Sequence, residues 1–254
     1  MGLVCRSAEQ MGLHRDGQAL GLSLIETEDR RRLWWQMQHV EMVLAVKCGL
    51  MSLYFTASWD TKLPLNVDDS ELQRAEADKK LVEEVAGLTK FSLTLFSYWI
   101  IAQQREFRQK CLDHPEPVDK SFLGPLTDRL ISGLEAGVNL KFLQYCDPIQ
   151  PIHALLQISA RAVICVLRLR ALHEMRLHME QPSEKLLGDY FDTCIQSLSY
   201  VAVTYSHPLL RPFRWLAEVS FGWHACEYLV SALQPSQSVS QLSILDYCLA
   251  NHGI

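Results

Sequence analysis

The sequence lacks the short motifs that mark the common enzyme classes. It contains no Walker A loop, no GxSxG elbow, no HExxH helix and no GxGxxG turn behind a predicted strand. Adjacent acids occur at Asp68-Asp69 and Glu83-Glu84, but neighbours in sequence do not converge on one substrate. No third group completes an acid–base site around them. These absences predict a protein that is not an enzyme.

A metal-binding cysteine cluster is also missing from the sequence. The eight cysteines are widely separated and form no CxxC pair, so neither a zinc knuckle nor a disulfide framework is indicated. His173 and His178 are five residues apart, whereas two histidines on one helix need a spacing of four to share a metal ion. The spacing therefore predicts no metal site. It predicts instead that the cysteines are small buried residues with free thiols in a reducing compartment. The cysteines are Cys5, Cys48, Cys111, Cys146, Cys165, Cys194, Cys226 and Cys248.

Long apolar runs and basic runs are scarce as well. The most apolar stretch, residues 152–169, is interrupted by His153, Arg161 and Arg168, so no membrane span is predicted. Arg6 and Glu9 interrupt the N-terminus before any signal-like apolar run develops. The formal net charge of −5 argues against autonomous DNA binding, which depends on neutralising phosphates. We expect a soluble intracellular protein.

Helical periodicity dominates the 254 residues, and strand-like alternation is almost absent. The sequence therefore predicts an all-α fold, an irregular bundle of about eight to ten helices in a single domain over residues 1–254. Gly12 is expected to form a left-handed cap. Trp59 to Asp69 is expected to be an extended connector, fixed by Pro64. The predicted helices are 3–13, 27–48, 82–111, 122–146, 152–179, 184–205, 213–233 and 240–250.

The second predicted helix carries the most informative pattern. Its apolar residues recur at spacings of three and four, which predicts one buried stripe, and its first turn is acidic. Ser23 or Thr27 is a candidate N-cap. The stripe consists of Leu33, Met37, Val40, Leu44 and Cys48.

Three successive arginines precede the tryptophans of this helix. Glu26 lies four residues before Arg30 and Glu28 four before Arg32, so helix-stabilising pairs are favoured over a nucleic-acid contact. Arg31 is left without such a partner. We expect it to reach another segment, with Asp60, Asp68 and Asp69 as the candidate acids.

The six tryptophans are expected to anchor the core or an interface, each with a partner for its indole N–H. Trp215 and Trp223 are eight residues apart and would share a helix face. An aromatic box for a ligand is the alternative interpretation.

Together these patterns resemble the fungal-specific transcription factor domain, the helical middle region of fungal zinc binuclear-cluster regulators. The resemblance is strong over residues 3–110 and weaker over 111–254. It is carried by residues 11–17 with 28–35, by residues 59–70, and more weakly by 212–215 with 221–225. The motif residues are Gly12, His14, Arg15, Asp16, Arg30, Arg31, Arg32, Trp34, Trp35, Pro64, Trp215, Trp223 and His224.

The resemblance implies a non-enzymatic, nuclear regulatory domain that controls nutrient use or a specialised-metabolite gene cluster. Zinc and DNA would be bound by the family's six-cysteine cluster, which this sequence lacks, so no cofactor is expected here. Protein partners or self-association are expected. Two alternatives stay open: a stand-alone helical module that dimerises with or inhibits a full-length regulator, and a helical small-molecule-binding protein.

The sequence departs from the family in two ways. Residues 40–42 and 48–51 differ from the Asp-Arg and Gly-Arg-Pro that relatives often carry. The resemblance also begins inside the family's domain, which suggests an N-terminal truncation. We therefore expect part of the stripes on 3–13 and 27–48 to face water, with Trp34 or Trp35 near that surface, and the chain to self-associate.

Overall fold

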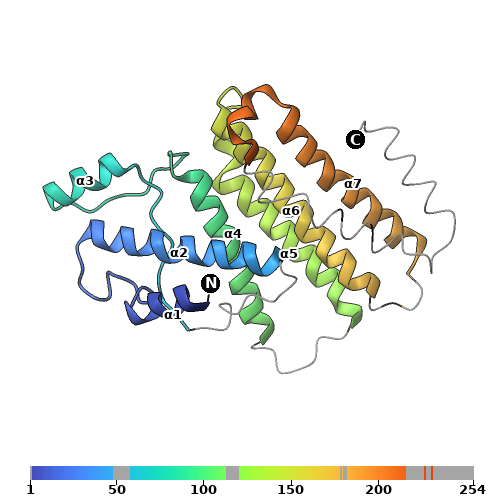
Figure 1. Cartoon of the computed structure of the whole chain (residues 1–254), viewed down its shortest axis with the longest axis horizontal. Coiled ribbons are helices and arrows are strands. Elements are labelled where there is room, and N and C mark those ends of the chain that lie inside the picture. The colour runs from blue at the N-terminus through green and yellow to red at the C-terminus, as the bar shows by residue number, and fades with distance from the viewer. Residues whose placement is uncertain are drawn as a thin grey trace. The chain divides into compact units, whose positions relative to one another are not determined.

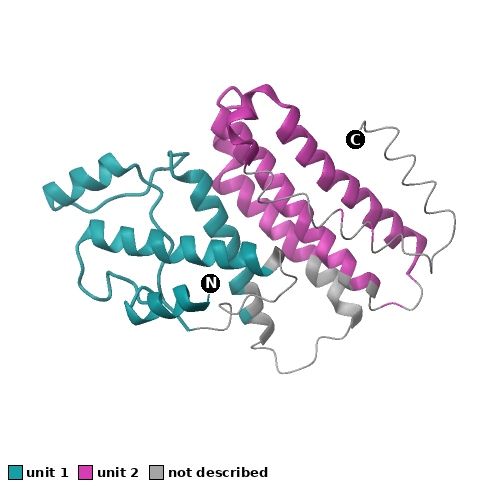
Figure 2. Ribbon diagram, in the orientation of Figure 1, with its two compact units in different colours: residues 1–117 teal, residues 118–254 magenta. Residues whose placement is uncertain are grey.

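The computed structural model describes residues 2–47, 58–112, 120–177 and 182–215, with the single residues 179, 226 and 230. These residues form helices and connecting coil, which confirms the all-α class. The chain divides into two compact units, residues 1–117 and 118–254 (Figures 1 and 2). That both units act as one regulatory domain stays a prediction. Most of the expected helix 213–233 and all of 240–250 lie outside the described residues.

Unit 1 is built around its longest helix, α2, which packs against α3 and α4 (Figure 1). Its core is rich in tryptophan, because three indole rings meet there with aliphatic residues from α1 and α4. The core residues are Ala8, Leu13, Trp34, Trp35, Met37, Trp59, Tyr98 and Ile101. The helices are α1 (Gly2–Gln10), α2 (Leu24–Lys47), α3 (Asp69–Asp78) and α4 (Ser92–Leu112).

Helix α2 begins at Leu24 because Ser23 and Glu26 form a capping box. The Glu26 N–H donates to Ser23 Oγ over 3.3 Å, and the Ser23 N–H donates to Glu26 Oε2 over 3.2 Å. Glu76 of α3 accepts a further bond from the Leu24 N–H at 3.0 Å. Of the two N-cap candidates, Ser23 is therefore correct and Thr27 lies inside the helix.

The predicted apolar stripe of α2 is wrong in its phase. Leu33, Val40 and Leu44 are exposed, and of the described stripe residues only Met37 is buried. The buried face is the opposite one. This face carries two large indoles and several buried polar groups. Because the prediction of the buried face was based on aliphatic residues alone, it did not find this combination. These residues are Thr27, Glu28, Arg31, Trp34, Trp35, Gln38, Glu41 and Ala45.

Helix α4 begins at Ser92, ten residues later than the expected start at Val82. Asn66 holds the preceding segment extended. Its Nδ2 donates to the carbonyls of Val85 at 3.0 Å and Gly87 at 2.8 Å, and its own carbonyl accepts the Val85 N–H at 3.0 Å. Because these bonds occupy the backbone groups of residues 85–87, the helical period in this stretch is overridden by a non-local contact.

Unit 2 is an arrangement of three long helices in which α6 packs against both α5 and α7 (Figure 2). The most apolar of the predicted helices is therefore the middle one of the three. Helix α7 starts where Ser183 Oγ accepts the Leu186 N–H, at 3.2 Å. The elements are α5 (Lys120–Lys141), the 3-10 helix η2 (Leu143–Tyr145), α6 (Pro151–Leu177), α7 (Glu184–Ser206) and the 3-10 helix η3 (Pro208–Phe213).

The core of unit 2 contains two of the buried thiols that the sequence predicts. Burial raises the pKa of Cys165 to about 11 and that of Cys194 to about 12. By length and composition, Pro151–His173 of α6 is also apolar enough to cross a membrane, with 44% of its most apolar window buried. The core helix of a soluble protein meets the same criteria, and the absence of a membrane span stays a prediction.

Candidate functional site

The motif residues of unit 1 meet where the turn after α1 crosses the start of α2. Helix α1 ends in a Schellman motif, in which Gly12 takes a left-handed φ of 69° as predicted. The Gly12 N–H donates to Glu9 O and the Leu13 N–H to Ala8 O, each over 2.9 Å. Leu13 and Ala8 are both buried in the unit 1 core, so the cap and the core form together.

Arg30 completes this helix end from outside. Its Nη2 donates to the carbonyl oxygens of Met11, at 3.1 Å, and Gly12, at 2.7 Å. A cation beside the last carbonyls of a helix also complements the negative end of the helix dipole. The expected pairing of Arg30 with Glu26 is therefore wrong, because Arg30 binds the turn after α1 and Glu26 caps α2.

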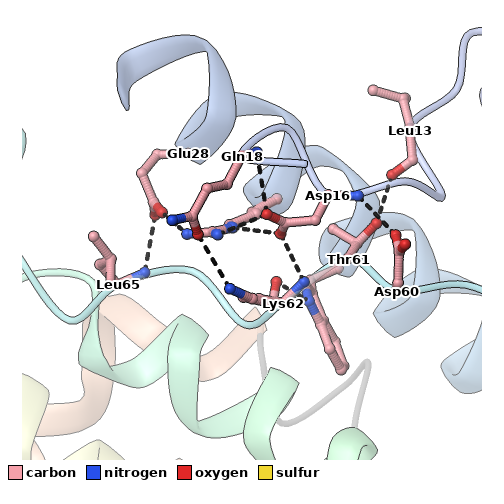
Figure 3. A network of polar contacts seen from close by, with 10 residues as sticks. Leu13, Asp16, Gln18, Glu28, Asp60, Thr61, Lys62 and Leu65 are labelled. Carbon is pink, nitrogen blue, oxygen red and sulfur yellow. Dashed lines mark hydrogen bonds and ion pairs between the residues drawn. The ribbon is translucent and has the colours of Figure 1, made fainter. Parts of the chain in front are cut away.

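The centre of the site is a buried ion-pair network of Asp16, Glu28 and Arg31 (Figure 3). Arg31 Nε and Nη2 donate to the two carboxylate oxygens of Asp16, at 2.8 and 2.9 Å. Arg31 Nη1 donates to Glu28 Oε1 at 2.6 Å. The prediction that Arg31 reaches another segment is confirmed, but its partner there is Asp16 and none of the three acids proposed.

Backbone amides of the connector donate further hydrogen bonds to both carboxylates. The Lys62 N–H donates to Asp16 Oδ2 and the Leu65 N–H to Glu28 Oε2, each over 2.9 Å (Figure 3). The Asp16 N–H in turn donates to Asp60 Oδ1 at 2.8 Å. The network therefore joins the turn, the helix α2 and the connector, three segments that are distant in sequence.

The ionisation of the network follows from these bonds. Burial alone raises the pKa of Asp16, but hydrogen bonds from Arg31 and the Lys62 N–H outweigh it and lower the pKa below its ordinary value. Burial lowers the pKa of Arg31, and the bonds to Asp16 and Glu28 more than compensate and raise it. The Asp16 carboxylate and the Arg31 guanidinium are thus both held charged although they are buried.

Pro64 and Thr61 fix the connector against the turn. Pro64 is fully buried, and its ring holds the extended backbone that brings the Leu65 amide to Glu28. Thr61 Oγ1 donates to Leu13 O at 2.8 Å. The Asp60 N–H donates to His14 O at 3.1 Å, so the connector and the turn run side by side.

An aromatic cluster underlies the network. The Trp59 ring meets Trp34 and Trp35 edge-on, with centroids 5.6 and 5.0 Å apart, and His14 lies 6.4 Å from Trp34. The guanidinium of Arg105 lies 3.6 Å above the Trp59 ring, within the range of a cation–π contact. Trp34 and Trp35 are 0% and 3% exposed, so the prediction that one of them lies near a surface is wrong.

The indole N–H groups of this cluster differ in whether they donate a hydrogen bond. Trp35 Nε1 donates to Lys62 O at 2.8 Å, which ties the cluster to the network above it. In the described part of the chain, Trp34 Nε1 and Trp59 Nε1 have no acceptor. The expectation of a partner for every buried indole therefore holds at Trp35 but not at these two.

The other two arginines of the motif lie at the edge of the site. Arg15 Nε pairs with Asp60 Oδ2 at 3.1 Å, where both side chains are exposed. Arg32 Nη1 pairs with Asp69 Oδ1 at 2.7 Å, and its guanidinium lies 4.6 Å above the Phe91 ring. The expected pair of Arg32 with Glu28 is wrong, because Glu28 turns inward to Arg31.

The weaker part of the predicted motif lies in unit 2 or outside the described residues. Trp215 belongs to unit 2 and is 60% exposed. Trp223 and His224 lie outside the described residues. The residue that the sequence analysis missed is Glu28, which it assigned to the wrong arginine. The i,i+3 spacing to Arg31 was the available signal.

Chemically, the network holds segments together and offers no reacting group. Both oxygens of Asp16 and both oxygens of Glu28 already accept hydrogen bonds. A nucleophile or general base must lie within reach of a substrate, and both carboxylates are buried. Among the described residues, no group of three metal-ligating side chains is found either.

Comparison with known proteins finds a family model that is similar to the first part of the chain. Residues 1–114 match the fungal specific transcription factor domain. The match covers the helices, the turn and the connector that build the site, so the motif that the sequence analysis recognised and the buried network are one feature.

Three proteins that are similar to the chain are named as transcription factors or regulators. The chain is 28% identical to pyriculol/pyriculariol biosynthesis cluster transcription factor 1 of Pyricularia oryzae, over 87% of the chain and 30% of the relative. It is 26% identical to aurofusarin cluster transcription factor aurR2 of Gibberella zeae, over 91% and 34%. It is 23% identical to transcriptional regulator AacuB of Aspergillus aculeatus, over 92% and 32%. The chain spans about a third of their length. No solved structure matches it.

Proposed function

We propose that this chain is the regulatory region of a nuclear transcription factor that controls the genes of one specialised-metabolite cluster. The observation that carries the proposal is the likeness to two cluster transcription factors over 87% and 91% of the chain. Both names favour specialised metabolism over nutrient use.

In this proposal the role of the chain is regulatory and non-catalytic. The buried network supports it, because every carboxylate oxygen of Asp16 and Glu28 is already hydrogen-bonded, as a scaffold requires. The network holds the turn, helix α2 and the connector together, which is a structural role.

The gene-cluster role is tested in the fungus that encodes the chain. The encoding gene is deleted and transcripts are compared with the parent strain under conditions that induce its secondary metabolism. We expect the transcripts of one contiguous group of biosynthetic genes to change together. Returning the gene with the Arg32→Lys substitution should restore the parental transcript levels, because this substitution changes an ion pair whose acid, Asp69, is exposed. Unchanged or scattered transcripts would overturn the proposal.

A nuclear site of action is tested separately with a fluorescent fusion at the natural expression level. We expect the signal to coincide with a nuclear stain. A signal that stays in the cytoplasm under inducing conditions contradicts this part of the proposal.

DNA contact and zinc binding are assigned to a six-cysteine cluster outside these residues. With a net charge of −5 the chain should not retard duplex DNA at physiological salt. Elemental analysis of purified protein should give much less than one zinc per chain. A salt-sensitive shift at low micromolar protein, or one tightly held zinc ion per chain, would contradict this assignment.

A further inference from the structure

Helix α3 lies at the edge of unit 1 and packs against α2 (Figure 1). The structure describes all ten residues of α3, and of these only Leu72 is buried. Leu72 is not part of the tryptophan-rich core of unit 1. Because a helix of this length is marginal in water by itself, α3 depends on its attachment to α2.

The attachment is made mainly by one carboxylate. Glu76 Oε2 accepts the N–H groups of Leu24 and Ile25, at 3.0 and 3.4 Å, in the first turn of α2. Amides of a first turn have no acceptor within their own helix, so they need one from outside. The carboxylate also lies at the positive end of the α2 dipole. We call these two bonds the Glu76 clasp.

The other polar contact between the two helices is weaker. Arg32 Nη1 pairs with Asp69 Oδ1 at 2.7 Å, but the Asp69 side chain is 76% exposed, and exposed ion pairs contribute little to stability. The bonds of the Glu76 clasp are themselves only partly buried. Dissolved salt therefore screens the charges that hold α3, much more than it screens the buried pair of Arg31 and Asp16.

The two ends of the segment that carries α3 are tied to each other independently of α2. Asn66 Nδ2 donates to the Val85 carbonyl at 3.0 Å, and Asp68 Oδ1 accepts the Lys90 N–H at 3.2 Å. These bonds close residues 69–84 into a loop with a fixed neck. Breaking the clasp therefore frees this loop without releasing the chain on either side of it.

We propose that residues 69–84, the α3 lid, open as a unit from the start of α2 while the tryptophan-rich core of unit 1 stays folded. Local opening of this kind costs less free energy than global unfolding. Opening uncovers the amides of Leu24 and Ile25, and closing covers them again. Another carboxylate reaches these amides only after Glu76 has left, so the lid regulates access to this end of α2.

Native-state hydrogen exchange of the whole 254-residue chain, followed by mass spectrometry of its peptides, measures the opening. We expect the amides of α3 to exchange at least roughly 100-fold faster than those of residues 34–38 in the core face of α2. Raising the salt concentration from about 0.05 to 0.5 M should speed the exchange of α3 several-fold and leave residues 34–38 unchanged. This comparison needs no substitution.

A matched pair of substitutions tests the clasp itself. Glu76→Ala should speed the exchange of α3 roughly tenfold or more, because hydrogen bonds to a charged group are lost. Asp78→Ala is the control, since Asp78 ends the same helix and pairs with the exposed Lys80. It should leave the exchange of α3 unchanged or slow it slightly, because alanine favours a helix. The tryptophan fluorescence maximum of both variants should match that of the wild type.

Three outcomes would overturn the proposal. Exchange of α3 as slow as that of residues 34–38 would mean that the lid opens only with global unfolding. Equal effects of Glu76→Ala and Asp78→Ala would mean that the clasp does not hold the lid. A red-shifted tryptophan maximum in Glu76→Ala would mean that the lid and the core do not open separately.

Discussion

Arg31 binds both carboxylate oxygens of Asp16 through two parallel N–H···O bonds, at 2.8 and 2.9 Å, with both side chains almost entirely buried. The two residues are fifteen apart and belong to different elements, the turn after α1 and the helix α2. Such a fork is a strong and directional contact. It fixes the angle at which the turn leaves α1 and thereby the position of the connector that lies against it.

Replacing this arginine by lysine should destabilise unit 1. Arg31→Lys keeps the charge but loses the fork, and it leaves a carboxylate partly unpaired in a buried place, so we expect a loss of about 3 kcal/mol. Arg32→Lys should cost less than about 1 kcal/mol, because Asp69 is largely exposed. Urea unfolding followed by tryptophan fluorescence measures both. Equal and negligible losses would refute the role given to Arg31.

Asp16 should make the stability of unit 1 depend on acid pH. Its pKa is lowered in the folded chain, so its contribution is complete above the unfolded value of about 3.9 and is lost as the pH falls through the folded value. The difference in unfolding free energy between wild type and Asp16→Asn should therefore shrink as the pH falls below about 4. Urea midpoints at each pH give this difference. A difference that stays constant would show that Asp16 does not titrate in this way.

Gly17 should tolerate no side chain, for reasons of space and not of backbone angle. A Cβ at this position would lie 2.8 Å from Thr27 Oγ1 and 2.9 Å from Thr27 Cα. Because backbone must move to relieve the second contact, we expect Gly17→Ala to lower the unfolding free energy by about 1–3 kcal/mol. Gly133 of α5 is the control, since a Cβ there meets nothing within 4 Å. Gly133→Ala should stabilise by about 0.5–1 kcal/mol. Thermal melts that rank the two variants the other way would contradict the packing described.

The buried thiols of unit 2 should resist alkylation in the folded chain. The pKa values of Cys165 and Cys194 are raised to about 11 and about 12, so little thiolate is present at neutral pH, while Cys226 is exposed. N-ethylmaleimide followed by peptide mass mapping should label Cys226 more than roughly tenfold faster than the other two. In urea the three rates should converge. Fast labelling of Cys194 in native buffer would mean that the α6–α7 core opens readily.

Local rules were sufficient for several elements. The left-handed cap at Gly12, the start of α7 at Ser183 and the long apolar helix α6 each depend on residues within a turn or two of one another. The motif of unit 1 could also be recognised before its geometry was known, because its residue types recur in a fixed order. Which of those residues form hydrogen bonds and ion pairs with one another could not be predicted from their order.

The sequence by itself determined the fold class, most helix positions in unit 2 and which residues make up the motif of unit 1. These features follow from the spacing of residues along one segment of the chain. Only the tertiary structure decided that Arg31 binds Asp16, that Asn66 delays the start of α4, and that the apolar row of α2 faces water. In each case a contact between distant segments outweighs a local preference of a few tenths of a kcal/mol, such as an i,i+4 pair. Two indoles and a buried fork on one face of α2 contribute more than three aliphatic residues on the other, and that difference sets which face is buried.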